Sequence, residues 1–260
     1  MGLCRMIVNS LKTLQRCTRL YQEPEFIPLS NCDGCDRSIQ IQSIASWNVQ
    51  GLFLYMSQSK EYQLLYELSL MNQDIICLQE VFEDSLKQSI IQTKQRTHPY
   101  YLLGNVHKRY VFGEDSGLLV LSKYPIEFQK EVVLNDAVLP DSLSNKSILY
   151  FSIGNLNLVN THLQSSNVNS AEHIATDQTK LILKESPFDR VIITGDLNNK
   201  QAFEDLQCQP NNDSTTWNQY ILDYIVPIHY DTFTLSISVS EREIEGITDH
   251  NCIQGILEYK

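Results

Sequence analysis

Short apolar segments of strand length place the strongest limit on how this chain can fold. Residues 39 to 48 alternate apolar and polar side chains, and an apolar run at 74 to 78 follows. Further apolar segments lie at 117–121, 148–153, 156–160, 191–194, 221–226, 232–239 and 252–257. Many of them are too close in sequence for every strand to be parallel, since a parallel crossover needs about a dozen residues or more. The pattern predicts a mixed or antiparallel double sheet.

Two stretches carry apolar residues at helical spacing instead. Leu64, Leu65, Leu68 and Met71 indicate a helix over residues 60 to 72, and a second helix is expected around 171 to 185. Helices of this kind bury one apolar face, so we expect them to cover the outside of the sheets.

The chain divides into a basic arm with a linker, residues 1–38, and a main body, residues 39–260. The first 22 residues hold four basic side chains and no acidic one, although the whole chain has 20 basic and 31 acidic residues and a net charge of −11. Pro24 and Pro28 are typical of a linker. With 260 residues and 42% hydrophobic residues, the chain can fill one sizeable core.

The basic arm predicts an amphipathic helix, because Leu3, Ile7, Leu11 and Leu14 recur at helical spacing. Such a helix could rest on an anionic membrane surface, or it could simply be a docked or frayed terminal helix. Seven cysteines at irregular positions favour a reducing compartment, and no uninterrupted run of about 18 apolar residues exists. We therefore expect an intracellular, cytoplasmic protein, in which residues 1–22 are the candidate for a peripheral membrane contact.

Polar residues that could bind a metal ion or take part in catalysis lie at or beside the ends of the strand-like segments. They are Asn48, Glu80, His162, Asp196, Asn198, Asp223, Asp249 and His250. Each one alone is compatible with a cap, a turn or a solvated strand end. Together, carboxylate and amide oxygens are the hard ligands that Mg²⁺ or Mn²⁺ prefers, and two histidines nearby complete the equipment for hydrolysing a phosphate ester.

Six short motifs occur in an order that resembles the endonuclease/exonuclease/phosphatase superfamily, which has the DNase I-like fold. They are Ser46-Trp47-Asn48-Val49-Gln50-Gly51, Cys77-Leu78-Gln79-Glu80-Val81-Phe82, Asn160-Thr161-His162-Leu163-Gln164, Thr194-Gly195-Asp196-Leu197-Asn198, Leu222-Asp223-Tyr224-Ile225 and Thr248-Asp249-His250. The resemblance spans about residues 39 to 258. It implies an α/β fold, a four-layer α/β sandwich with two central mixed β-sheets flanked by helices, and a catalytic domain over 39–260 with its site along one edge.

Within that superfamily the chain is most similar to the neutral sphingomyelinases. The stretch from Asp115 to Ile126 resembles their glycine-rich strand with the following Ser-Lys-x-Pro-Ile, and Ser144 to Ser147 resembles their Asn-Lys-Gly. Ser147 stands where that family has glycine, and only about 20 residues separate Asp196 from Trp217. The similarity implies a phosphodiester substrate, sphingomyelin or a related phospholipid.

The resemblance also implies a role for each matching residue. Glu80 would be the principal metal ligand, helped by Asn48 and Asp249, for one or two ions of Mg²⁺ or Mn²⁺. His250 would act as the general base, with Asp223 orienting it and Asp196 aligning the attacking water. His162 and Asn198 would donate to phosphate oxygens, and Lys146 from the Asn-Lys stretch would bind substrate.

Three other functions stay open on the sequence. A magnesium-dependent endonuclease or exonuclease has the same fold, and so does a sugar or inositol phosphatase. Nucleic acid is disfavoured as a partner by the net charge of −11. A catalytically inactive membrane adaptor is the third alternative, although every expected catalytic position is filled.

Deletion of residues 1–22 should weaken binding to anionic vesicles while hydrolysis of a soluble substrate stays nearly unchanged. Each basic residue near an anionic surface contributes about 1 kcal/mol, and the rest of the chain, with 16 basic and 31 acidic residues, is repelled. Co-sedimentation of the intact and truncated proteins at two salt concentrations measures the effect, and salt should weaken it. Equal binding by both proteins would instead indicate a structural or frayed helix.

Overall fold

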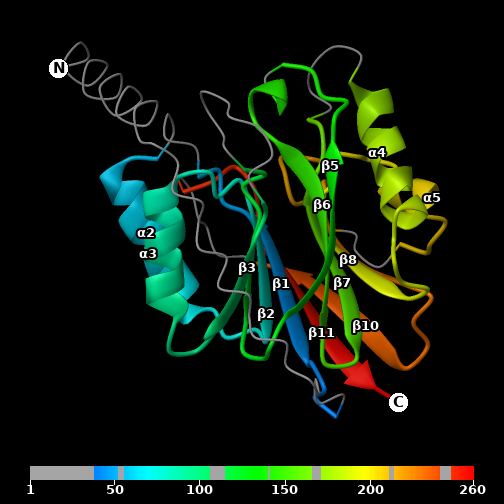
Figure 1. The fold of residues 1–260 in the computed structure, drawn as a ribbon, viewed down its shortest axis with the longest axis horizontal. Helices are drawn as coiled ribbons and strands as arrows, with labels where there is room; N and C mark the ends of the chain where they lie inside the picture. Colours follow the sequence, from blue (N-terminus) through cyan, green and yellow to red (C-terminus); the bar gives the residue numbers. More distant parts are fainter. Residues whose placement is uncertain are drawn as a thin grey trace.

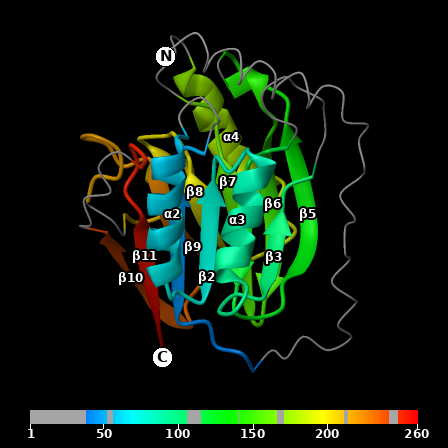
Figure 2. The same ribbon diagram turned by 90° about the vertical axis from the view of Figure 1, so that its left-hand side faces the viewer.

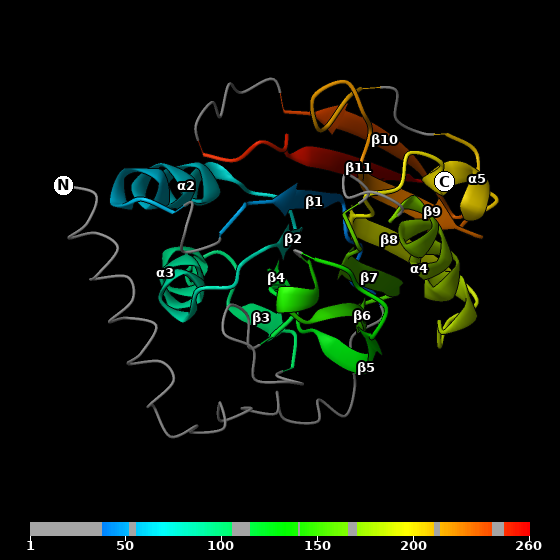
Figure 3. The same cartoon turned by 90° about the horizontal axis from the view of Figure 1, so that it is seen from above.

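The computed structural model describes residues 38–51, 56–105, 115–139, 141–165, 171–210, 214–240 and 247–260. Two β-sheets pack face to face between two layers of helices (Figure 1; Figure 3 shows the same layers from above). This arrangement confirms the predicted four-layer α/β sandwich. The predicted basic arm lies outside the described residues, so the boundary at residue 38 stays a prediction. None of the described helices is long and apolar enough to span a membrane.

The first sheet has six strands in the order β10-β11-β1-β2-β4-β3. These are β10 (Phe233–Val239), β11 (Ile253–Tyr259), β1 (Ser43–Asn48), β2 (Ile75–Gln79), β4 (Leu119–Ser122) and β3 (Tyr100–Leu103). The second sheet has five strands in the order β5-β6-β7-β8-β9. These are β5 (Glu127–Leu134), β6 (Lys146–Ile153), β7 (Leu156–His162), β8 (Val191–Asp196) and β9 (Asp223–Ile228). Both sheets are mixed, because β1 is parallel to β2 and β7 to β8, and the other pairs are antiparallel.

Helices cover the outer face of each sheet. The helices α2 (Gln58–Leu70) and α3 (Asp84–Lys94) lie over the first sheet, and Figure 2 shows them in front of the sheet with β2 visible between them. The helices α4 (Glu172–Lys184) and α5 (Ala202–Asp205) lie on the side of the second sheet (Figure 1), and a short 3₁₀ helix, η1 (Asp141–Leu143), precedes β6. The predicted helices at 60–72 and 171–185 are therefore present, each with its ends shifted by one or two residues.

Three apolar cores hold the layers together. The central core lies between the sheets and includes Phe151 and Leu158. A second core joins the first sheet to α2 and α3 and includes Trp47 and Leu64. The third core, which includes Ile182, joins the second sheet to α4 and α5. Both faces of each sheet are covered by apolar cores, so each sheet exposes mainly its outer strands and the ends of its strands. A polar site therefore has to lie there, and we call the end of the sheets that carries such residues an edge.

The structure differs from the sequence pattern at β1. The alternation over residues 39–48 predicted one polar face, but every residue from Ile44 to Asn48 is buried. The strand lies between β11 and β2, with an apolar core against each face. Ser46 and Asn48 are therefore buried polar residues that need hydrogen-bond partners inside the protein.

The two parallel strand pairs bring functional residues to one edge. Asn48 at the end of β1 is opposite Gln79 at the end of β2, and His162 at the end of β7 is opposite Asp196 at the end of β8. Gly195 allows the second pair to form, because its φ of +131° is a conformation that favours glycine. A Cβ atom at this position would collide with the carbonyl oxygen of Thr161 on β7.

Replacing Gly195 with Ala should lower the free energy of unfolding by about 3 kcal/mol, since both the strained φ and the collision with Thr161 oppose the side chain. Gly255→Ala is the matched control, because its Cβ would meet only the ends of side chains, with Leu235 nearest at 2.9 Å and Ile237 and Ile225 at 3.4 and 3.5 Å. We expect this control to cost about 1 kcal/mol or less. Urea denaturation measures both values, and equal losses would show that the collision at Gly195 is relieved elsewhere.

Candidate active site

The centre of the site is an amide that contacts two carboxylates from different sheets. The Asn48 side chain donates from Nδ2 to Glu80 Oε1 at 2.9 Å and to Asp196 Oδ2 at 3.0 Å. Asn48 and Asp196 are almost completely buried, and the Glu80 side chain is 17% exposed. The Asn48 side chain therefore joins the edge of the first sheet to the edge of the second.

Local turns aim these side chains. Asn48 Oδ1 accepts from the backbone N–H of Gln50, and Asp196 Oδ1 accepts in the same way from Asn198, so both strands end in the same kind of side-chain turn. Gln50 and Asn198 each have a φ of +48°. Glu80, directly after β2, has a φ of +58°, which costs free energy for a residue with a side chain. Strain of this kind is found where the surrounding structure holds a functional group in place.

His162 faces the same two carboxylates. Its Nε2 lies 3.7 Å from Glu80 Oε1 and 3.7 Å from Asp196 Oδ2. Burial keeps the pKa of His162 well below its usual value, and the charges of Lys146 and His250 lower it further. The ring is therefore neutral near neutral pH, and its buried Nδ1 has no hydrogen-bond partner among the residues that the structure describes.

His250 and Asp223 form a closely bonded pair beside Asp196. His250 Nδ1 lies 2.8 Å from Asp223 Oδ2, and His250 Nε2 lies 3.6 Å from Asp196 Oδ2. The backbone of both residues is held as well: Trp47 Nε1 donates to the carbonyl of His250, and the N–H of Asp223 donates to Thr216 Oγ1. A carboxylate on one ring nitrogen fixes the orientation of the imidazole and stabilises its charged form.

Burial and like charge shift the pKa values of these groups. Burial raises the pKa of Glu80 above its usual value, and it is the main cause that raises the pKa of Asp196 to about 7. For His250, burial alone would lower the pKa, but the carboxylates of Asp223 and Asp196 outweigh burial and raise it to about 10. The site therefore holds more negative charge than its own cations balance, and it favours a proton or a bound cation.

The remaining predicted residues lie around this centre. Asn198 is buried and donates from Nδ2 to the carbonyl of Leu163 at 3.2 Å. Asp249 is half exposed, accepts from Trp217 Nε1 at 2.9 Å and lies 4.0 Å from His250 Nε2. The structure thus places Asp249 next to the imidazole of His250.

Lys146 is in the site but directs its ammonium group at protein atoms. Its Nζ contacts the carbonyl of Leu163 at 2.7 Å, the carbonyl of His162 at 3.4 Å and Asp141 Oδ1 at 2.9 Å. In this geometry Lys146 holds the backbone beyond His162, and its charge also lowers the pKa of Glu80. Its predicted contact with substrate would require these bonds to rearrange.

A buried amide pair that the sequence analysis did not assign supports the site from below. Gln79 Nε2 donates to Asn160 Oδ1 at 2.8 Å, and Asn160 Nδ2 donates to the carbonyl of Leu78 at 3.1 Å. Gln79 precedes Glu80, and Asn160 lies two residues before His162. The sequence signal for both amides was their place in the motifs: Gln79 stands directly before Glu80, and Asn160 stands two positions before His162.

The site can be tested for a fit to a hard divalent cation. The carboxylates of Glu80, which is partly buried, and of Asp196, which is buried, contact the same amide nitrogen and face the same imidazole. Their oxygens are suitable donors for such a cation. Asn48 could add its Oδ1 only if the amide turned, because Nδ2 faces the two carboxylates and Oδ1 faces the backbone N–H of Gln50. Ligand atoms of Asp196, Asp223 and His250 also lie within 4.8 Å of one another, but an ion between them would compete with the His250–Asp223 bond. Glu80 and Asp196 lie on either side of the Asn48 amide nitrogen, so an ion held by both would have to displace that amide.

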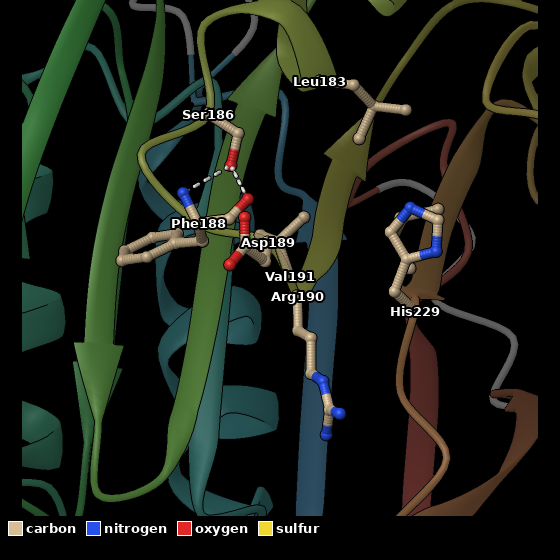
Figure 4. Close-up of a pocket in the computed structure, with 8 residues that line it drawn as sticks. Leu183, Ser186, Phe188, Asp189, Arg190, Val191 and His229 are labelled. Carbon is tan, nitrogen blue, oxygen red and sulfur yellow. Dashed lines mark hydrogen bonds between the residues drawn. The ribbon is translucent and has the colours of Figure 1, made fainter.

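A separate hollow lies at the opposite end of the second sheet (Figure 4). It is lined by residues at the end of α4, the start of β8 and the end of β9, including Ser186, Arg190 and His229. Ser186 Oγ is bonded to the backbone of Phe188, and exposed Arg190 pairs with Asp231. Among the described residues that line this hollow, no histidine is bonded to a carboxylate as His250 is bonded to Asp223.

The profile of the Endonuclease/Exonuclease/phosphatase family matches residues 45–239. The chain belongs to this family. The match covers the strands that supply Asn48, Glu80, His162, Asp196 and Asp223, whereas His250 lies beyond it. The predicted family is thereby confirmed.

Named relatives point in the same direction. Sphingomyelinase C of Bacillus cereus is 26% identical over 217 residues, which cover 72% of this chain and 62% of the relative. Phospholipase C of Staphylococcus aureus is 27% identical over 173 residues, which cover 56% and 52%. The chain thus spans between half and two thirds of the length of these relatives.

Among solved structures, a double mutant of beta toxin from Staphylococcus aureus with bound magnesium ions has a TM-score of 0.68 at 19% identity. The match covers 84% of this chain and 99% of the toxin. At this identity the likeness concerns the fold, and it agrees with the two-sheet sandwich described above.

Replacing Glu80 with Gln should abolish stabilisation by magnesium. Saturating Mg²⁺ should raise the Tm of the unmodified protein, because a ligand present at about 100 times its Kd adds about 2.7 kcal/mol of stability. The variant should show little of this rise. In EDTA the variant should be at least as stable as the unmodified protein, since a buried negative charge has been removed.

Glu185→Gln is the matched control for that measurement, because it removes the same charge at the far end of α4, where Glu185 pairs with Lys130. Thermal denaturation with Mg²⁺ and with EDTA gives all the values. An equal rise of Tm in the Glu80 variant would move the metal site elsewhere.

Proposed function

We propose that this chain is a divalent-metal-dependent phosphodiesterase that hydrolyses the phosphate ester of sphingomyelin or a related phospholipid. The observation that carries the proposal is the contact of Asn48 with Glu80 and Asp196, with His162 facing both carboxylates and His250 facing Asp196. The relatives named sphingomyelinase C and phospholipase C support the phospholipid as the substrate class.

Glu80 and Asp196 would hold the cation, which we infer to be Mg²⁺, with Mn²⁺ as an alternative. When bound, a divalent ion supplies a Lewis acid that polarises a phosphoryl oxygen and stabilises the leaving oxygen. Its charge would also replace the proton that Asp196, with a pKa of about 7, otherwise shares in the buried site. We propose that the site binds one or two such ions.

His250 would take the proton from the attacking water at Nε2. Asp223 holds Nδ1 at 2.8 Å, so Nε2 is the nitrogen left to face the site. With a pKa of about 10, His250 is protonated at neutral pH when no cation balances Asp196. A cation held at Asp196 would oppose the imidazolium, and His250 Nε2 would then be free to accept a proton.

His162 and Asn198 would bind the phosphoryl oxygens. Neutral His162 can donate from one ring nitrogen, and Asn198 has one amide hydrogen beyond its bond to the carbonyl of Leu163. Donors fixed before substrate arrives stabilise the charge that develops on a phosphodiester as water attacks. Lys146 would act indirectly, by holding the backbone at His162 and Leu163.

The substrate preference can be measured with four substrates: sphingomyelin, a lysophospholipid, an inositol phosphate and DNA. Each should be assayed with Mg²⁺, Mn²⁺ and EDTA. We expect metal-dependent release of phosphocholine from sphingomyelin and only slow cleavage of DNA. His250→Ala and Asp223→Asn should each reduce kcat by about 10²–10⁴-fold, because the proton acceptor is lost or misoriented.

Two outcomes would overturn the proposal. Rapid Mg²⁺-dependent cleavage of DNA with no release of phosphocholine would make the chain a nuclease. Full activity in both variants would remove His250 and Asp223 from the mechanism, and an inactive unmodified protein in the presence of metal would favour a binding role.

A further inference from the structure

Three large apolar side chains are exposed close together between β5 and β6. Val138 is 38% exposed, Leu139 62% and Leu143 41%. Single exposed apolar residues are ordinary on protein surfaces, but a group on one short connection marks a surface that contacts something apolar. We call these three residues the β5–β6 apolar turn.

The topology puts this turn at the edge that carries the site. Strand β6 runs antiparallel to β7, with Ile148 opposite Thr161, so β6 begins where β7 ends at His162. Strand β5 is antiparallel to β6 and therefore ends at the same edge. In Figure 1 the connection between them lies at the upper end of the molecule.

The polar groups of the turn face inward. The backbone N–H of Val138 donates to Gln164 Oε1 at 2.8 Å, and Gln164 Nε2 donates to Asp141 Oδ2 at 2.7 Å. Asp141 Oδ1 pairs with Lys146 Nζ at 2.9 Å, and the same nitrogen contacts the carbonyl of Leu163. The segment is thus fastened to the residues that follow His162, while its apolar side chains point to solvent.

This orientation is the reverse of an ordinary surface turn, which exposes polar groups and buries apolar ones. The hydrogen bonds hold the backbone of the turn in one conformation before a partner arrives. Less conformational entropy is then lost when a partner covers the apolar side chains. The structure therefore presents a small apolar tip at a constant position relative to the site.

We propose that the β5–β6 apolar turn inserts into the surface of an electrically neutral, zwitterionic lipid bilayer and sets the site against the lipid headgroups. The inference rests on the proposed function, because a phospholipid presents its phosphodiester at that surface. The charges near the turn favour a neutral bilayer. Lys146 is already paired with Asp141, Asp136 beside the turn is exposed, and the whole chain has a net charge of −11. An anionic surface would repel this edge, whereas a neutral one would not.

The test measures binding of the full chain, in EDTA, to vesicles of phosphatidylcholine and sphingomyelin. The double variant Leu139→Ser and Leu143→Ser should bind at least about tenfold more weakly, because burial of two leucine side chains is lost. Its hydrolysis of a soluble phosphodiester in Mg²⁺ should be unchanged. The matched control is Tyr62→Ser with Leu70→Ser on α2, where the side chains are 67% and 48% exposed. It should bind as tightly as the unmodified protein.

Fluorescence gives a second measurement that does not depend on affinity. A Leu139→Trp variant should be quenched by vesicles that contain brominated phosphatidylcholine, and a Tyr62→Trp variant should not. Absence of quenching at residue 139, or equal quenching at both positions, would overturn the proposal. So would equal loss of binding in both double variants.

The outcome is separable from that of the proposed function. Quenching and weakened binding in EDTA, combined with no lipid hydrolysis in Mg²⁺, would support the docking surface and overturn the proposed function. Hydrolysis of sphingomyelin vesicles with unchanged binding of the Leu139 and Leu143 variant would support the function and overturn the docking surface.

Discussion

The hydrogen bonds from Asn48 to Glu80 and Asp196 connect the two sheets at the point where the site forms. A shift of one sheet against the other would separate these carboxylates, so the site requires an accurate packing of the sandwich. The buried amides of Gln79 and Asn160 hold that packing one layer deeper. Polar contacts inside a core are costly unless every partner is in place, and here they specify the relative position of the sheets.

The groups at the edge with the site lower the stability of the folded chain. Glu80 has a left-handed backbone conformation, and it shares a buried region with Asp196 and Asp223. Like charges in a low dielectric destabilise the folded chain until a cation or a proton offsets them. The arrangement is thus prepared to bind a cation, and the three apolar cores supply the stability that the edge lacks.

The opposite edge shows how the fold treats basic groups. After α2, the carbonyls of Met71, Asn72 and Gln73 are contacted by Lys94, Lys123 and His98 in turn, at 2.6, 2.6 and 2.7 Å. Burial lowers the pKa of His98 to about 4 and that of Lys94 to about 8. These groups satisfy the backbone where the chain turns into β2. Lys94, Lys123 and His98 therefore have a structural role at this edge.

The sequence by itself determined the succession of strands, the polar residues at their ends and the family, because apolar periodicity and short motifs are local properties of the chain. It did not reveal α3 or the edge strands β3 and β5, since buried Lys87 and Lys94 in α3 and the partly exposed residues of β5 blur the periodic pattern. Only the tertiary structure decided that β1 is buried on both faces and that Asn48 contacts two carboxylates. It also decided that Lys146 points at backbone carbonyls. These contacts join residues far apart in the chain, as Asn48 and Asp196 are, and they depend on how the two sheets pack rather than on any local spacing.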